Sequence, residues 1–132
     1  MNFEITKRLI YIPMFLAVLS GCSNPPEKLG RLDVKKWRGD RGSCKNERTS
    51  LVADFKAEQQ QLVGESIEKV GEILGRPDIH ELGDRGVKFY VYFLEKGPQC
   101  ENTGKKSDAK KVVLKFNAIG LLSEITYQDK RL

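Results

Sequence analysis

The sequence predicts an α+β fold in which two N-terminal helices pack on a three-stranded antiparallel sheet, as a two-layer sandwich. Apolar residues recur at helical spacing in the first half of the chain, whereas β-branched and aromatic segments with strand periodicity fill the second half. A three-stranded sheet is stable only when another element covers one of its apolar faces, and the helix pair is the available cover.

Two short helices are expected in the first half. The first runs from about Glu47 until Gly64 ends it, and its apolar residues share one face: Leu51, Val52, Phe55, Leu62 and Val63. The second begins after Ser66, a residue type that caps helix N-termini, and ends at Gly75, with Pro77 just beyond. Its inner stripe consists of Ile67, Val70, Ile73 and Leu74.

Three strands follow in the second half. The segment 87–94 (VKFYVYFL) lies between glycine-containing turns and is rich in residues that favour strands. We assign one of its faces to the core, with Val87, Phe89, Val91 and Phe93. The other face is expected to be free of helices and carries Tyr90, Tyr92 and Leu94. The strands 112–117 and 121–127 are joined by a hairpin turn over residues 117–120.

The residues ahead of the first helix fall into two segments. Residues 23–32 (SNPPEKLGRL) contain two prolines, a glycine and no periodic apolar pattern, which is typical of a flexible linker. Residues 33–48 are rich in charge and glycine, and we expect an ordered cap in which Trp37 lies over the core. The domain is therefore expected to span residues 33–132, behind a linker at 22–32.

The first 21 residues have the features of an export signal. Two basic residues, Lys7 and Arg8, precede an uncharged stretch of 13 residues from Leu9 to Gly21, which is shorter than the roughly 20 residues that cross a bilayer. The motif LSGC at residues 19–22 resembles the lipobox of bacterial lipoprotein precursors. That resemblance implies cleavage after residue 21 and a diacylglyceryl group on Cys22, which anchors the chain to a membrane. The alternatives are a plain signal peptide or a buried N-terminal helix.

The lipobox implies a place in the bacterial cell envelope. Ser23, directly after the lipid-bearing Cys22, is in Gram-negative lipoproteins a residue that permits transfer to the outer membrane, and a periplasm-facing position is expected there. Removal of residues 1–21 takes two basic residues and one acidic residue with it, and leaves 111 residues with a net charge of +4. This mild excess favours an ordinary solvated surface, allows attraction to anionic lipid or polysaccharide, and does not indicate nucleic-acid binding.

Two cysteines remain after lipidation, Cys44 and Cys100, in an oxidising compartment where we expect them to pair. Closing a loop of 56 residues stabilises the fold by about 4 kcal/mol on the chain-entropy account. The alternatives are two free thiols or a metal site, but the sequence has no CxxC spacing and one histidine, so we expect no metal.

The stretch LVGESIEKVGEILGRPD, followed by the aromatic strand and a terminal hairpin, resembles the SmpA/OmlA (BamE-like) family of small bacterial outer-membrane lipoproteins. The likeness covers residues 45–127, and the positions that carry it are Gly64, Ser66, Val70, Leu74, Gly75, Pro77 and Asp78. It implies the helix-helix-three-strand sandwich also found in β-lactamase inhibitory proteins. The chain departs from the family pattern in its cysteine pair, its WRGDRGSC segment and its long loop over 95–110.

Features that would support catalysis are few. His80 is the only histidine, and its position just after the GRPD turn favours a surface or loop residue over a catalytic base. Cys44 and Cys100, once paired, cannot act as nucleophiles. The GDRG segments at 39–42 and 83–86 lack the spacing of a phosphate-binding loop. We therefore expect no enzyme activity and no cofactor; a small hydrolase is the weakest hypothesis.

A binding role is expected for the helix-free face of the sheet. Tyr90 and Tyr92, joined by Tyr127, are candidate partner-binding residues, although such rings can also merely stabilise the sheet. The first hypothesis is a lipid-anchored, non-enzymatic binding or scaffolding module that assists outer-membrane protein assembly or envelope integrity, with another envelope protein as its partner. The second is a periplasmic inhibitor or regulator that caps an enzyme with the same face. The oligomeric state is not predicted.

Overall fold

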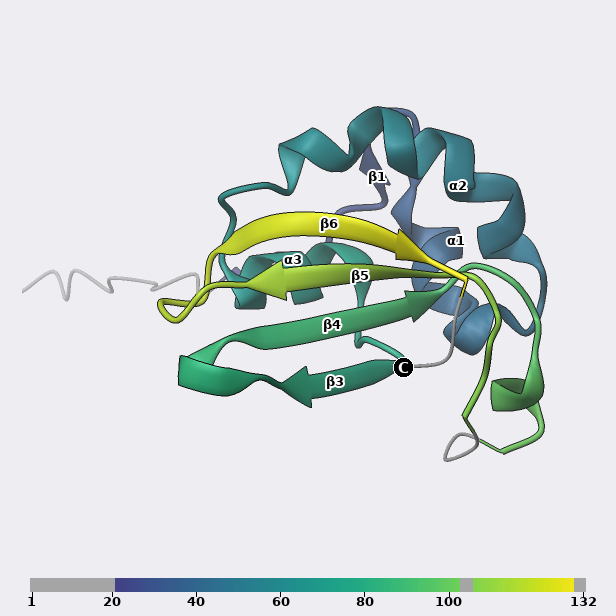
Figure 1. The fold of residues 1–132 in the computed structure, drawn as a ribbon. Coiled ribbons are helices and arrows are strands. Elements are labelled where there is room, and N and C mark those ends of the chain that lie inside the picture. The colour runs from purple at the N-terminus through teal and green to yellow at the C-terminus, as the bar shows by residue number, and fades with distance from the viewer. Residues whose placement is uncertain (1–20, 103–105, 130–132) are drawn as a thin grey trace, which may run out of the picture.

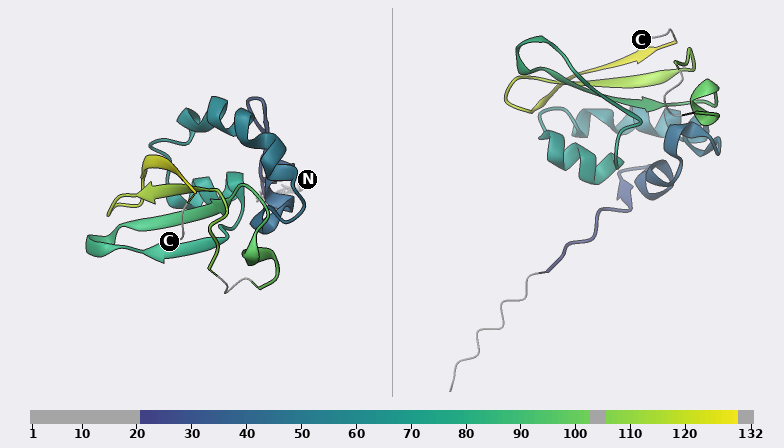
Figure 2. Two further views of the ribbon diagram at one scale, coloured as in Figure 1. Left: turned by 45° about the vertical axis from the view of Figure 1, so that its right-hand side comes forward. Right: turned by 90° about the horizontal axis from the view of Figure 1, so that it is seen from below.

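The computed structural model describes residues 21–102 and 106–129, and these form two layers. Three helices lie against one face of a four-stranded antiparallel sheet of order β3-β4-β5-β6 in this part of the chain (Figure 1). The helices are α1 (Val34–Gly39), α2 (Glu47–Glu58) and α3 (Ile67–Leu74). The strands of the sheet are β3 (Ile79–Leu82), β4 (Lys88–Phe93), β5 (Lys111–Phe116) and β6 (Leu122–Gln128). Figure 2 shows that no helix covers the other face of the sheet.

The predicted architecture of two helices on a three-stranded sheet is wrong, because the described residues hold a third helix, a fourth strand and a separate hairpin. The missed strand β3 has four residues, of which three are exposed, so it lacks the apolar alternation that reveals a half-buried strand. The missed helix α1 has six residues and no full helical stripe. Its start is nevertheless fixed by Asp33, whose side chain accepts a hydrogen bond from the backbone N–H of Lys36.

The expected linker reaches too far into the chain. A small hairpin, β1 (Lys28–Leu29) with β2 (Leu32–Asp33), pairs within it, and Gly30 takes the positive φ of +56° that the turn requires. Leu32 is fully buried in the main hydrophobic core. The folded domain therefore begins near Lys28, and the linker is correspondingly shorter.

The capping signals around α3 are confirmed. The Ser66 side chain accepts a hydrogen bond from the N–H of Lys69 at 3.1 Å, and Gly75 ends the helix with a φ of +79°. The Arg38 guanidinium donates to the carbonyl of Ile73 at 2.7 Å, which satisfies one of the carbonyls left free at the helix end. Helix α1 is thereby tied to the C-terminus of α3.

The two faces of β4 are the reverse of those expected. Tyr90, Tyr92 and Leu94 belong to, or pack against, the core beneath the helices, while Val91 and Phe93 lie on the opposite face. Both sets are apolar and both are largely buried, so the alternation in the sequence does not distinguish them.

The centre of the core is aromatic. Trp37 is fully buried, as predicted, and stacks on Phe55 of α2 with ring centroids 4.8 Å apart. Its ring also lies 6.0 Å from that of Tyr92, so α1, α2 and the sheet meet at one indole. Such ring pairs add to the free energy gained by removing their apolar area from water.

Replacement of Leu32 by alanine tests whether the N-terminal hairpin belongs to the domain. Leu32→Ala should lower the free energy of unfolding by about 2–5 kcal/mol, because a buried leucine is lost and a cavity remains. Leu82→Ala is the matched control, since that side chain is 77 % exposed and its loss should cost no more than about 0.5 kcal/mol. Equal effects in urea denaturation would show that the hairpin is not part of the core.

Candidate functional site

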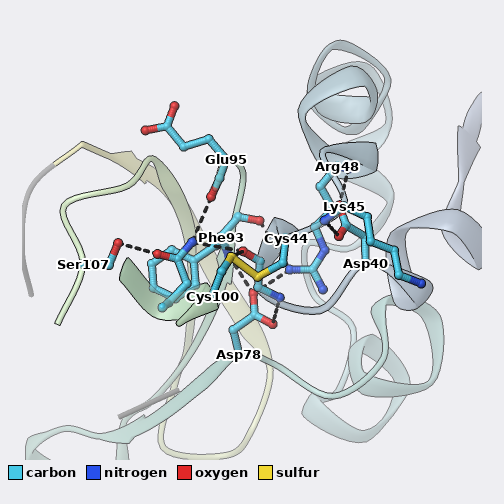
Figure 3. The surroundings of a disulfide bond; sticks show 11 residues. Asp40, Cys44, Lys45, Arg48, Asp78, Phe93, Glu95, Cys100 and Ser107 are labelled. Atoms are coloured by element: carbon cyan, nitrogen blue, oxygen red, sulfur yellow. Dashed lines mark hydrogen bonds and ion pairs between the residues drawn. A yellow bond between two sulfur atoms is a disulfide. The ribbon is translucent and has the colours of Figure 1, made fainter. Parts of the chain in front are cut away.

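A disulfide between Cys44 and Cys100 ties the segment ahead of α2 to the segment that follows β4, with Cα atoms 5.6 Å apart. The expected pairing is therefore present in the structure. The Gln99 amide nitrogen donates to the carbonyls of Gly42 at 3.0 Å and Glu95 at 2.9 Å, and the Ser107 hydroxyl donates to the Gln99 amide oxygen (Figure 3). The loop after β4 is thus fastened by side-chain contacts as well as by the disulfide.

Beside the disulfide lies a fully buried arginine, Arg48 of α2. Its Nε donates to the carbonyl of Trp37 at 3.1 Å, and its Nη1 donates to Asp78 Oδ2 at 2.5 Å and to the carbonyl of Phe93 at 3.3 Å. The guanidinium carbon lies 5.1 Å from the Trp37 ring centroid and 5.4 Å from that of Tyr92. The charge is therefore held by a carboxylate, two carbonyls and two aromatic faces.

Two buried carboxylates complete this cluster. Asp40 accepts hydrogen bonds from the backbone N–H groups of Lys45 at 2.7 Å and Arg48 at 2.9 Å, near the start of α2. Asp78 accepts from the N–H of Gly42 at 2.9 Å and of Phe93 at 2.8 Å, besides the guanidinium. We call Asp40, Arg48 and Asp78 the buried ionic cluster. It joins α2, the turn after α1 and the end of β4.

The sequence reasoning missed the ionic cluster. Asp78 is singled out there only as a position of the SmpA/OmlA resemblance, and no role is predicted for Arg48. The available signal was position, because Arg48 lies three residues before Leu51 and so shares the buried face of α2. Charge on an apolar stripe indicates a buried pair, but nothing local identifies a partner 30 residues away.

The expected partner surface at Tyr90 and Tyr92 is wrong. Tyr92 is fully buried, its hydroxyl donates to the carbonyl of Gly75 at 2.8 Å, and burial raises the pKa of its phenol well above the ordinary value. Tyr90 is partly buried and packs edge-on against Phe116, with ring centroids 5.1 Å apart. Neither ring lies on a helix-free face, so neither offers the surface that was predicted.

Tyr127 differs from the other two tyrosines, because 38 % of it is exposed. Its hydroxyl donates to the Gln59 amide oxygen at 2.5 Å, the Lys56 ammonium lies 4.7 Å from its ring centroid, and burial raises the pKa of its phenol to about 12. The ring borders a hollow of about 530 Å³ between α2 and the end of β6, which we call the α2–β6 groove. Other residues that line it are Val52, Lys56, Leu94, Glu95 and Lys110.

Cys22 is exposed and forms no disulfide. Residues 21–27 carry no strand or helix and lead away from the helix side of the domain in Figure 2. The rest of the predicted signal peptide, residues 1–20, lies outside the described residues. Among the residues that are described, no helix is long and apolar enough to cross a membrane, and no group of three acidic, histidine or cysteine side chains is placed to hold a metal ion.

Comparisons with protein-family models, curated proteins and solved structures give no match for this chain. The SmpA/OmlA resemblance therefore has its motif residues as its only support. In the structure Ser66 and Gly75 cap α3, and Val70 and Leu74 are fully buried. Asp78 has a further role, because it carries the buried ion pair with Arg48.

Substitutions in the ionic cluster test its importance for folding. Arg48→Met and Asp78→Asn should each lower the free energy of unfolding by about 3–5 kcal/mol, because each leaves the remaining partner buried without its counterion. The double variant should lose less than the sum of the two, which a double-mutant cycle in urea would reveal.

Arg31→Met provides the matched control for this cycle. Arg31 pairs with Glu58 at 3.9 Å with its side chain 72 % exposed, and such exposed pairs contribute about 0–1 kcal/mol. A loss of stability in Arg48→Met no larger than in Arg31→Met would show that the buried pair is not needed.

Proposed function

We propose that the chain is a lipid-anchored, non-enzymatic binding or scaffolding module of the bacterial cell envelope, of the SmpA/OmlA type. Cys22 is the lipid-bearing residue, and the domain that starts near Lys28 is the binding part. The observation that carries this is the arrangement of an exposed, unpaired Cys22 just ahead of a cystine-stabilised domain. Lys28 lies six positions after Cys22, so the tether spans at most about 20 Å and keeps the domain close to the bilayer.

The proposed location is the outer membrane, on its periplasmic side, where disulfides persist. The Ser23 that follows Cys22 supports transfer to that membrane by its likeness to outer-membrane lipoproteins. A role in outer-membrane protein assembly or envelope integrity fits this position, and the proposal assigns no catalytic residue.

The α2–β6 groove replaces the sheet face as the proposed partner surface. Its aromatic wall, Tyr127, is held in place by the hydrogen bond to Gln59 and by the neighbouring Lys56, so little conformational entropy is lost when a partner binds. Val52 and Leu94 add apolar surface to the groove. These features fit an apolar side chain on a membrane protein of the envelope, entering beside the tyrosine ring.

Metabolic labelling with a palmitate analogue tests the anchor. The wild-type chain expressed in bacteria should incorporate the label and fractionate with membranes, because the Cys22 thiol and the new N-terminus become acylated. Cys22→Ser should remain unlabelled and retain its leader. An unlabelled wild type, or equal labelling of the two chains, would contradict the proposed anchor.

Photo-crosslinking in intact cells tests the groove. A photoreactive amino acid at position 127 should yield a discrete adduct with a membrane protein of the envelope, because this side chain borders the groove. Position 82 is the control, since Leu82 is exposed on β3 at the opposite edge of the sheet. Similar adducts from both positions, or none from position 127, would reject the groove. An adduct with a soluble enzyme would instead support the inhibitor hypothesis.

A further inference from the structure

A second hollow, of about 600 Å³, lies at the disulfide and is separate in its lining from the α2–β6 groove. We call it the cystine hollow. The residues that matter for its chemistry are Arg41, Arg76, Asp78, Phe93 and the two half-cystines, Cys44 and Cys100. They come from four separate segments of the chain, so the hollow exists only in the folded domain.

The electrostatic balance of the cystine hollow is positive. The Asp78 carboxylate is already matched by the buried guanidinium of Arg48 and by two backbone N–H groups. The side chains of Arg41 and Arg76 make no ion pair or hydrogen bond with any other residue that the structure describes. Two guanidinium charges therefore border one hollow without a counterion from the described part of the chain.

The backbone that carries the two arginines is fixed. Gly42, next to Arg41, donates its N–H to Asp78 and accepts at its carbonyl from Gln99, and its φ of +67° suits glycine. Arg76 lies between Gly75, which ends α3, and Pro77, whose ring fixes its own φ. The backbone is thus rigid at both arginines, and little ordering of the chain is needed for both side chains to reach one anion.

We propose that the cystine hollow binds a phosphate monoester. Guanidinium groups bind phosphate oxygens in a bidentate manner, and a monoester is close to a dianion at neutral pH, so one such group matches both arginines. A carboxylate would neutralise only one of them. This inference does not depend on the lipid anchor.

Titration of the protein with inorganic phosphate, monitored by NMR, tests the site. The chain is expressed in bacteria, purified in a nonionic detergent with its disulfide intact, and the Gly42 amide and Gln99 side-chain signals are observed. We expect saturable shifts, and Arg41→Gln and Arg76→Gln should each raise the dissociation constant by about tenfold or more, as expected when a charged hydrogen-bonding partner is removed.

Arg85→Gln is the matched control. Arg85 is exposed in the turn before β4, and its substitution removes the same charge as the other two. It should change the dissociation constant by less than about twofold, as for a distant exposed charge. Shifts that do not saturate, or an equal weakening by Arg85→Gln, would overturn the proposal.

Two further ligands identify the source of the phosphate group. Phosphatidic acid in the micelles and soluble glycerol 3-phosphate both carry a phosphate monoester, so we expect both to bind. Tighter binding of phosphatidic acid would indicate a lipid headgroup as the natural ligand. Equal binding would indicate a free ester. Phosphatidylglycerol carries a diester with one charge, and binding as tight as that of phosphatidic acid would overturn the assignment to a monoester.

Discussion

The structure depends on a buried ion pair between Arg48 and Asp78. A guanidinium that is fully removed from water is tolerated only when a counterion matches its charge, and Asp78 can supply that counterion only if the turn after α3 lies against α2. The same carboxylate fixes Gly42 and the last residue of β4, Phe93. One residue pair thereby sets the position of both layers, and an alternative packing would leave a charge buried without a partner.

The disulfide constrains the same turn, at Gly42, that the Asp78 carboxylate holds. It joins Cys44 to Cys100 across 56 residues, and Gly42 stands between the two constraints, since its N–H is bound by Asp78 and its carbonyl by Gln99. The covalent link reduces the freedom of the unfolded chain, whereas the ion pair selects among folded arrangements. The two effects therefore differ in kind, although they fix the same turn.

Sequence reasoning succeeded where the signal was local. Neighbouring residues identify the two ends of α3, at Ser66 and Gly75, and the turn after β5. The even number of cysteines left after lipidation identifies the disulfide. It failed where the answer depends on a distant partner: β3 is defined by its pairing with β4, and Arg48 by a carboxylate 30 residues away. The predicted face of Tyr92 is wrong because both sides of β4 are apolar and largely buried, so the alternation alone does not show which side the helices cover.

Because Tyr92 is buried, the candidate binding surfaces are the two hollows at the end of the sheet where β4 ends, and not the face of the sheet. There the segment that follows β4 contributes to both hollows, with Leu94 and Glu95 on the α2–β6 groove and Gln99 and Cys100 on the cystine hollow. The shape of each hollow therefore depends on one short segment. Because that segment is held by the disulfide and by the Gln99 amide, reduction of the cystine would loosen the walls of both hollows together, while the core under the helices would keep its aromatic packing.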